Sequence, residues 1–113
     1  MKLVIDQMRD ENFTIKLSDS NGVYNLSSDE FLIFCVKKRA SDTDALIRKV
    51  ISDEMITPDQ TGYVLSLSYS DTNITPGYYY WDLSLKDGNH LYTVIATDDF
   101  VVRGSCNRTL ITS

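Results

Sequence analysis

The stretch PGYYYWDLSLKDGNHLYTVIA (residues 76–96) places three tyrosines and the only tryptophan of the chain side by side. After the Pro76-Gly77 turn signal, the side chains follow the period of two that is typical of a β-strand. One face carries Tyr79, Trp81, Leu83 and Leu85, and the other carries Tyr78, Tyr80, Asp82, Ser84 and Lys86. We expect the first face to fill a hydrophobic core, which leaves Tyr78 and Tyr80 on the outside.

A hairpin is expected directly after this strand. Asp87-Gly88-Asn89 is a short turn signal between two apolar-polar alternating stretches. The returning strand, HLYTVIATDDFVV, is expected to point four residues inward: Tyr92, Val94, Phe100 and Val102. The acidic pair Asp98-Asp99 interrupts its pattern and indicates a bulge or a crossing between sheets.

Four further stretches have the character of strands: ENFTIKLS (11–18), FLIFCVKK (31–38), ALIRKVI (45–51) and GYVLSLSYS (62–70). Asn21-Gly22 between the first two predicts a tight hairpin, because both residue types accept a positive φ. The stretch 31–38 is apolar on both faces, whereas a strand buried on one side alternates apolar with polar residues. We therefore expect its second face, formed by Phe31, Ile33 and Cys35, to be covered by another surface.

These patterns together predict the fold class and the domain organisation. Turn signals recur about every ten residues and no helical period persists, which favours an all-β sandwich of about seven antiparallel strands. A chain of 113 residues fits one domain with its own core. We expect that domain to span residues 1–103 and to be followed by a C-terminal arm, 104–113, whose apolar Leu110 and Ile111 dock on another surface.

The charge and the composition exclude several classes of partner. The net charge is −5, and the densest basic stretch, Lys37 to Arg39, is followed by Asp42 and Asp44. We expect no nucleic-acid binding, because phosphate contacts from Lys and Arg supply most of that affinity. No apolar run approaches the roughly 18 residues of a spanning helix, so no membrane insertion is expected. The first residues lack a signal-peptide core, which predicts a protein that is made in the cytoplasm.

The sequence offers no recognisable catalytic or metal-binding constellation. His90 is the only histidine and no CxxC is present, so the usual zinc ligands are missing. Cys35 lies among apolar residues, where burial makes a thiol a weaker nucleophile. Because the second cysteine, Cys106, is far away in the sequence, we expect two free thiols rather than a disulfide. The adjacent carboxylates of Asp98 and Asp99 point to opposite faces of a strand. We expect no enzymatic activity, no metal and no cofactor.

A carbohydrate-binding module is the alternative that the aromatic residues leave open. Small β-sandwiches display aromatic rings that stack on sugars, and Tyr78 and Tyr80 are spaced to share an outer face. The same tyrosines also suit a protein partner or cross-strand packing. Residue types alone do not choose among these roles.

The order of the segments resembles the N-terminal, immunoglobulin-like domain of the phage baseplate upper protein family. The resemblance rests on ENFTIKLSDSNGVYNLSS followed by FLIFCVKKRASDTDALIRKV, and then on a G-Y-Y-x-D-L type strand, a D-G hairpin and a closing F-x-V strand. It covers roughly residues 8–103. Trp81 stands where tyrosine is common in that family, and Asp98-Asp99 stands where glycine is common.

The resemblance implies an immunoglobulin-like β-sandwich in a phage or prophage virion protein without catalytic activity. Family members attach receptor-binding or fibre proteins to a tail baseplate, so the expected partners are other virion proteins of the tail, baseplate or head, and further copies of the chain. A host glycan is the alternative partner. The expected contact residues are Phe31, Ile33, Cys35, Tyr78, Tyr80, Arg108, Leu110 and Ile111.

Overall fold

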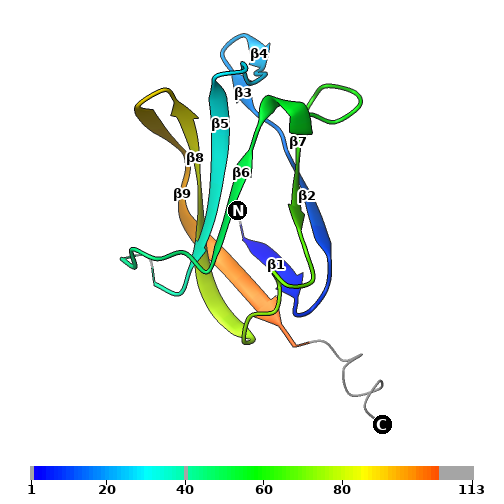
Figure 1. Ribbon diagram of the computed structural model, residues 1–113, viewed down its shortest axis with the longest axis vertical. Helices are drawn as coiled ribbons and strands as arrows, with labels where there is room; N and C mark the ends of the chain where they lie inside the picture. Colours follow the sequence, from blue (N-terminus) through cyan, green and yellow to red (C-terminus); the bar gives the residue numbers. More distant parts are fainter. Residues whose placement is uncertain (1, 40, 105–113) are drawn as a thin grey trace.

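The computed structural model describes residues 2–39 and 41–104, and nearly all of its regular structure is β-strand. The strands β8 (Gly77–Asp87) and β9 (His90–Arg103) form a long hairpin from the stretch with which the sequence analysis began (Figure 1). Gly88 takes a φ of 59° in the connecting turn, a conformation that costs glycine little. The predicted Asp87–Asn89 hairpin is therefore confirmed.

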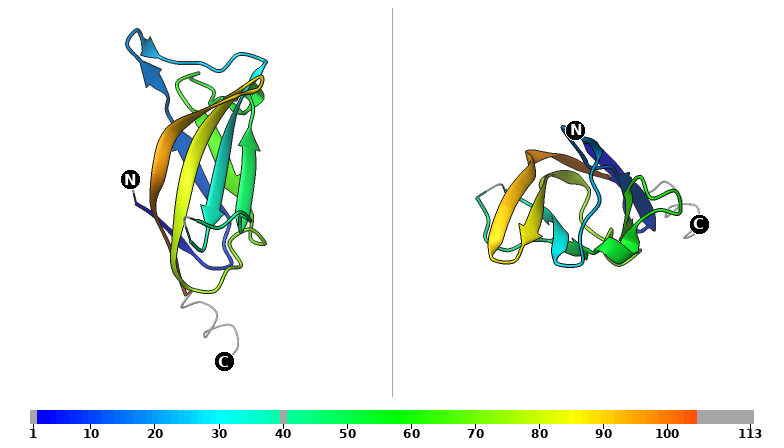
Figure 2. Two further views of the ribbon diagram at one scale, coloured as in Figure 1. Left: turned by 90° about the vertical axis from the view of Figure 1, so that its left-hand side faces the viewer. Right: turned by 90° about the horizontal axis from the view of Figure 1, so that it is seen from above.

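A five-stranded sheet contains this hairpin and has the strand order β1-β9-β8-β5-β6. Its other strands are β1 (Leu3–Asp6), β5 (Glu30–Lys37) and β6 (Ile47–Ile51). All pairs are antiparallel except β1 and β9, which run parallel. The sheet curls into a half-barrel, as the view from above shows (Figure 2).

The concave side of the curled sheet faces a second layer made of β2 (Glu11–Ile15) and β7 (Tyr63–Leu67), which pair antiparallel. Between β2 and β5 the chain forms a small hairpin, β3 (Ser18–Asp19) and β4 (Gly22–Val23). A single 3-10 turn, η1 (Asp53–Met55), lies between β6 and β7. The predicted hairpin at Asn21-Gly22 is present, but only Gly22 has a positive φ, and the Asp19 carboxylate accepts the Asn21 N–H at 2.8 Å.

The core lies between the two layers and contains the side chains that the alternation assigned to it. Tyr79, Trp81 and Leu83 of β8 are buried, and Leu85 packs against the core while partly exposed. The Phe34 ring of β5 lies between Trp81, at a centroid distance of 5.7 Å, and Phe100, at 6.3 Å. The inward direction predicted for Trp81 is therefore confirmed.

The strand β9 departs from the predicted alternation in its first half. Three residues of β8, from Trp81 to Leu83, match four residues of β9, from Asp98 to Ile95. A second extra residue follows immediately, because Ser84 lies opposite Thr93. The bulge indicated by the acidic pair thus lies directly before Asp98, and each extra residue shifts the face that later side chains occupy.

Two of the four predicted inward residues are wrong, one because of this shift and one because of its place near the hairpin tip. Phe100 and Val102, beyond the bulge, are buried as predicted. Val94 is exposed because the extra residues put Ile95 against the core in its place. Tyr92 lies opposite Leu85 but is 52% exposed, because the tip of the β8–β9 hairpin projects away from β2 and β7 (Figure 1).

The strand β1 was not predicted, and its parallel pairing corrects the expectation of a purely antiparallel sandwich. Leu3 lies opposite Phe100 and Asp6 opposite Arg103, so β1 covers only the last part of β9. The Asp6 carboxylate accepts the Arg103 guanidinium Nε at 3.0 Å at the end of this pair. A four-residue strand that follows the first two residues of a chain has too few alternations for a sequence prediction.

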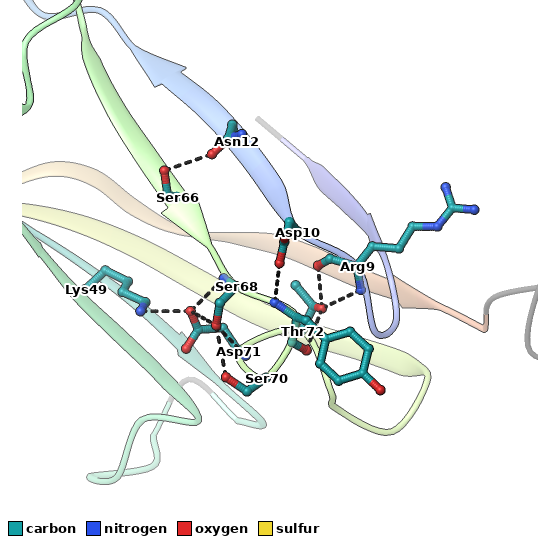
Figure 3. Close-up of polar contacts among 10 residues, drawn as sticks. Arg9, Asp10, Asn12, Lys49, Ser66, Ser68, Ser70, Asp71 and Thr72 are labelled. Atoms are coloured by element: carbon teal, nitrogen blue, oxygen red, sulfur yellow. Dashed lines mark hydrogen bonds and ion pairs between the residues drawn. The ribbon is translucent and has the colours of Figure 1, made fainter.

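A polar loop, residues 68–72, closes one end of the molecule (Figure 3). The fully buried Thr72 hydroxyl donates to the Arg9 carbonyl at 2.6 Å and accepts the Arg9 N–H at 2.9 Å. The Asp10 carboxylate accepts the Tyr69 N–H at 2.6 Å. These bonds attach the loop after β7 to the turn between β1 and β2.

Candidate interaction surface

The residues predicted to make contacts lie on the convex face of the five-stranded sheet, here called the outer face. Because the strands pair in register, the side chains of this face form rows across β6, β5, β8 and β9. One row is Val50, Ile33, Ser84 and Thr93, and the next is Arg48, Cys35 and Asp82. The structure therefore brings the predicted residues of β5 and β8 onto one surface.

Tyr78 and Tyr80 point outward, as the period-two pattern predicts. Tyr78 is 78% exposed and Tyr80 is 41% exposed, although each is the immediate neighbour of a core residue of β8. Tyr78 lies opposite Val101 of β9, which in turn lies opposite Val4 of β1. The two tyrosines thus mark one end of the outer face, with aliphatic side chains beside them.

Phe31, Ile33 and Cys35 are not covered by the part of the chain that the structure describes. Phe31 is 36% exposed, and Ile33 and Cys35 are half-buried by their neighbours in the sheet. Val50, which lies opposite Ile33, is also exposed. The apolar pattern of β5 predicted that another surface covers this face. Residues 2–39 and 41–104 do not supply that surface.

A polar band separates these two apolar ends of the outer face. Cys35 lies between Arg48 and Asp82, and Tyr80 lies between Lys37 and Asp99. Both signs of charge occur within two adjacent rows. A partner of this face would therefore meet apolar ends with a charged middle, a composition closer to a docking surface than to a core.

The Cys35 thiol in this band is a poor nucleophile. Burial raises its pKa, and the neighbouring Asp82 carboxylate raises it further, against the opposite effect of Arg48 and Lys37. The thiol is therefore protonated at neutral pH. The protonated thiol adds a small apolar surface to the outer face.

Sequence reasoning missed two exposed apolar residues of this face. Leu91 lies opposite Lys86 near the hairpin turn and is exposed, as is Val50 on β6. The alternation of Ile47, Lys49 and Ile51 could have placed Val50 outward. Leu91 could also have been placed outward by alternation, because the two extra residues of β9 cancel and Leu91 lies on the opposite face from its neighbour Tyr92.

Within the described residues, no cluster of three or more His, Cys, Asp or Glu side chains could hold a metal ion. His90 stands in the exposed hairpin turn, with its ring 6.2 Å from that of Tyr92. No helix among these residues is long and apolar enough to cross a membrane.

A second surface feature, not predicted from the sequence, lies between β6 and β7. A cavity of about 380 Å³ separates them and is lined by Lys49, Val50, Ile51, Met55, Ile56, Val64, Leu65 and Ser66. Across the described residues, β6 has β5 as its strand partner and β7 has β2. We call this cavity the β6–β7 slot.

The remaining predicted contact residues, Arg108, Leu110 and Ile111, lie outside the described residues, as does Cys106. A scan against protein-family models, a search of curated proteins and a search of solved structures each found no match to the chain.

Proposed function

We propose that the chain is a non-enzymatic structural protein of a phage virion, an adaptor or accessory subunit that binds other virion proteins through its outer face. The proposal starts from the resemblance of residues 8–103 to the baseplate upper protein family. The observation that carries it is the outer face itself. Tyr78 is 78% exposed there, although the other face of its strand, β8, supplies buried core residues.

The strand arrangement supports the immunoglobulin-like part of this proposal. In that fold one sheet contains strands C, F and G, with C′ added in variable-type domains, and the other contains B and E. The order β1-β9-β8-β5-β6 facing β2-β7 fits this pattern, with β5, β8 and β9 in the places of C, F and G. The order of these strands along the chain also matches the order of strands C, F and G in an immunoglobulin-like domain.

A side-chain bond at the start of β8 supports the same assignment. The Tyr79 hydroxyl donates to the carbonyl of Thr75, four residues upstream, at 2.5 Å. A tyrosine that bonds back to nearby upstream backbone at the start of strand F is the tyrosine corner of immunoglobulin-like domains. Trp81 follows two residues later, where antibody domains have a cysteine, and packs on Phe34.

Incorporation into virions tests the proposal. Particles purified from a host that carries the gene should contain the chain by mass spectrometry. The double variant Tyr78→Ala, Tyr80→Ala should reduce its amount per particle by about ten-fold, the loss expected when two interface aromatics are truncated. Tyr69→Ala is the matched control, because Tyr69 is 51% exposed on the distant 68–72 loop. Particles that lack the wild-type chain would refute a virion role.

A carbohydrate-binding module is the second candidate, and one observation favours it. Tyr80 has the polar side chains of Lys37 and Asp99 directly beside it, an arrangement of an aromatic ring with hydrogen-bonding groups that suits a sugar. Binding to a glycan array that is lost in Tyr78→Ala or Tyr80→Ala, with the melting temperature unchanged, would support this candidate over the first.

A further inference from the structure

The charges in the middle of the outer face are separated by sign. The positive groups of the polar band, Lys37 and Arg48, lie on β5 and β6, whereas the negative groups, Asp82 and Asp99, lie on β8 and β9. The boundary runs between β5 and β8, which lie side by side in the sheet (Figure 1). We call the β5–β6 side the positive half of the band and the β8–β9 side the negative half.

These four charged groups are available to a partner. None of them forms an ion pair with another described residue. Arg48 and Asp99 are exposed, and Lys37 and Asp82 are partly exposed. Lys86, the remaining outward charge of β8, lies two rows from Asp82 toward the hairpin turn and outside the band. Both halves of the band therefore keep their charge toward the solvent.

A second copy of the same face supplies the opposite charge to each half. The relevant two-fold axis lies between the two faces and runs along the strands, between β5 and β8. Rotation about this axis lays each row of one face on the same row of the other face, with the two sides exchanged. The positive half of each copy then meets the negative half of the other, and such complementarity fixes the register of an interface.

The alternative two-fold axis, across the strands, gives no such match. It lays β5 on β5 and β8 on β8, with the strand directions reversed. The charged band then meets either the same charges of the other copy or its apolar end, with Phe31, Ile33 and Val50. Like charges in contact are unfavourable, and so is a charge that is covered by apolar groups. The charge pattern therefore selects the axis along the strands.

The central strands are complementary under the same rotation. Phe31 lies opposite Lys86 within one copy, so the rotation places Phe31 of one copy against Lys86 of the second. In the same way, Tyr80 meets Lys37 of the second copy. A cation over an aromatic ring is a favourable contact, and the symmetry makes each contact occur twice.

We propose that the outer face binds the outer face of a second copy of the chain, with the two-fold axis along the strands between β5 and β8. This inference rests on the proposed role of the outer face as a protein-contact surface, and it names the partner. Because the sheet is convex, the contact is confined to β5, β8 and the side chains next to them (Figure 2). Interfaces below about 1,200 Å² form transient complexes, so we expect a dimer in equilibrium with the monomer.

Sedimentation equilibrium of the full chain over a range of concentrations tests the dimer. The variant Lys37→Asp, Arg48→Asp makes both halves negative, and the variant Asp82→Lys, Asp99→Lys makes both halves positive. Each variant should raise the dissociation constant of the dimer by about ten-fold or more, because like charges then face each other. An equimolar mixture of the two variants should form a heterodimer about as tightly as the wild type dimerises.

The four substitutions combined in one chain are the matched control. They exchange the two halves but keep the net charge and the complementarity, so the combined variant should dimerise like the wild type. A wild-type chain that stays monomeric at about 1 mM would overturn the proposal. A combined variant that keeps the melting temperature of the wild type but stays monomeric would overturn it too.

Isotope-filtered NMR on a mixture of labelled and unlabelled wild-type chain identifies the axis. Nuclear Overhauser effects between copies should connect the Phe31 ring with Lys86 and the Tyr80 ring with Lys37. Effects that connect Phe31 with Lys37, and Tyr80 with Lys86, would belong to the axis across the strands and would contradict the proposal.

These results are separable from the test of the virion role. Virions that contain the chain, together with an isolated chain that stays monomeric, would overturn the dimer alone. A dimer in solution, together with virions that lack the chain, would refute the virion role alone.

Discussion

At the scale of single residues, Trp81 shows how one side chain holds the core side of the five-stranded sheet together. It is almost fully buried and packs against Phe34, which itself contacts Phe100. Truncation of a large aromatic residue in a core costs about 3–5 kcal/mol. We therefore expect Trp81→Ala to lower the free energy of unfolding by that amount in a denaturant titration.

The outer-face neighbour Tyr78 provides the control for that experiment. Its side chain is largely exposed on the same strand, so Tyr78→Ala should change the free energy of unfolding by less than about 0.5 kcal/mol. Similar losses in the two variants would mean that the two faces of β8 are not distinguished by burial.

A second prediction at this scale concerns Tyr24 and alkaline pH. The Tyr24 hydroxyl donates to the Glu30 carboxylate at 2.5 Å, and this hydrogen bond, with a smaller contribution from burial, raises the pKa of Tyr24 to about 12. The raised pKa means that the folded state favours the protonated hydroxyl. Its stabilisation is complete below the ordinary pKa of 10.0 and is lost as the pH rises through about 12.

The comparison with Tyr24→Phe isolates this effect. The melting temperature of the wild type should exceed that of Tyr24→Phe at pH 9, and the difference should shrink as the pH rises from 10 to 12. Titration of the other tyrosines affects both proteins alike. A difference that stays constant over this interval would show that the Tyr24–Glu30 bond does not change the stability.

At the scale of elements, the 68–72 loop is held by one buried hydroxyl. Thr72→Val keeps the size of the side chain but removes the acceptor of the Arg9 N–H and the donor to the Arg9 carbonyl. A buried polar group left without its partner costs about 1–3 kcal/mol. We expect that loss in the free energy of unfolding, and faster hydrogen exchange at Arg9.

Ser70→Ala in the same loop is the control. The Ser70 hydroxyl is exposed and pairs with that of Ser68 at 3.0 Å, so its removal should have little effect. A loss as large as that of Thr72→Val would mean that the loop depends on its surface bonds rather than on the buried hydroxyl.

The elements also show what the sequence could and could not predict. Strict alternation placed Tyr79, Trp81 and Leu83 in the core correctly, because β8 has no extra residues of its own. The same rule was wrong at Val94, since a bulge changes the face count and depends on the partner strand. It was also wrong at Tyr92, which lies opposite Leu85 but beyond the reach of the second layer. The outer position of Phe31 and Ile33 was predictable, but whether another surface covers them depends on groups beyond their own strand.

At the scale of the whole molecule, the pairing of distant segments was beyond sequence reasoning. The β6–β7 slot lies between strands of two different sheets, because β6 pairs with β5 and β7 pairs with β2. The sequence around Val50 and Val64 does not indicate that a gap lies between them. The outer face and the slot are therefore properties of the assembled sandwich rather than of any single stretch of sequence.

The parallel pairing of β1 with β9 has a mechanical consequence. The chain enters this pair at Leu3, opposite Phe100, and leaves it after Arg103, opposite Asp6. A tensile load between residues 2 and 104 therefore pulls the two strands along their length in opposite directions, so that all four residue pairs resist together. A load between Met8 and residue 104 enters at the other end of β1 and opens the pairs one at a time.

Force spectroscopy can compare these two directions. With cysteine handles at the stated positions and serine in place of Cys35 and Cys106, the first geometry should unfold at a higher force than the second. Forced unfolding is governed by the unfolding rate, so the difference would reflect the barrier to separating β1 from β9. Equal forces would place the mechanical barrier elsewhere in the sandwich. A domain that resists shear between residues 2 and 104 is suited to transmitting tension without unfolding.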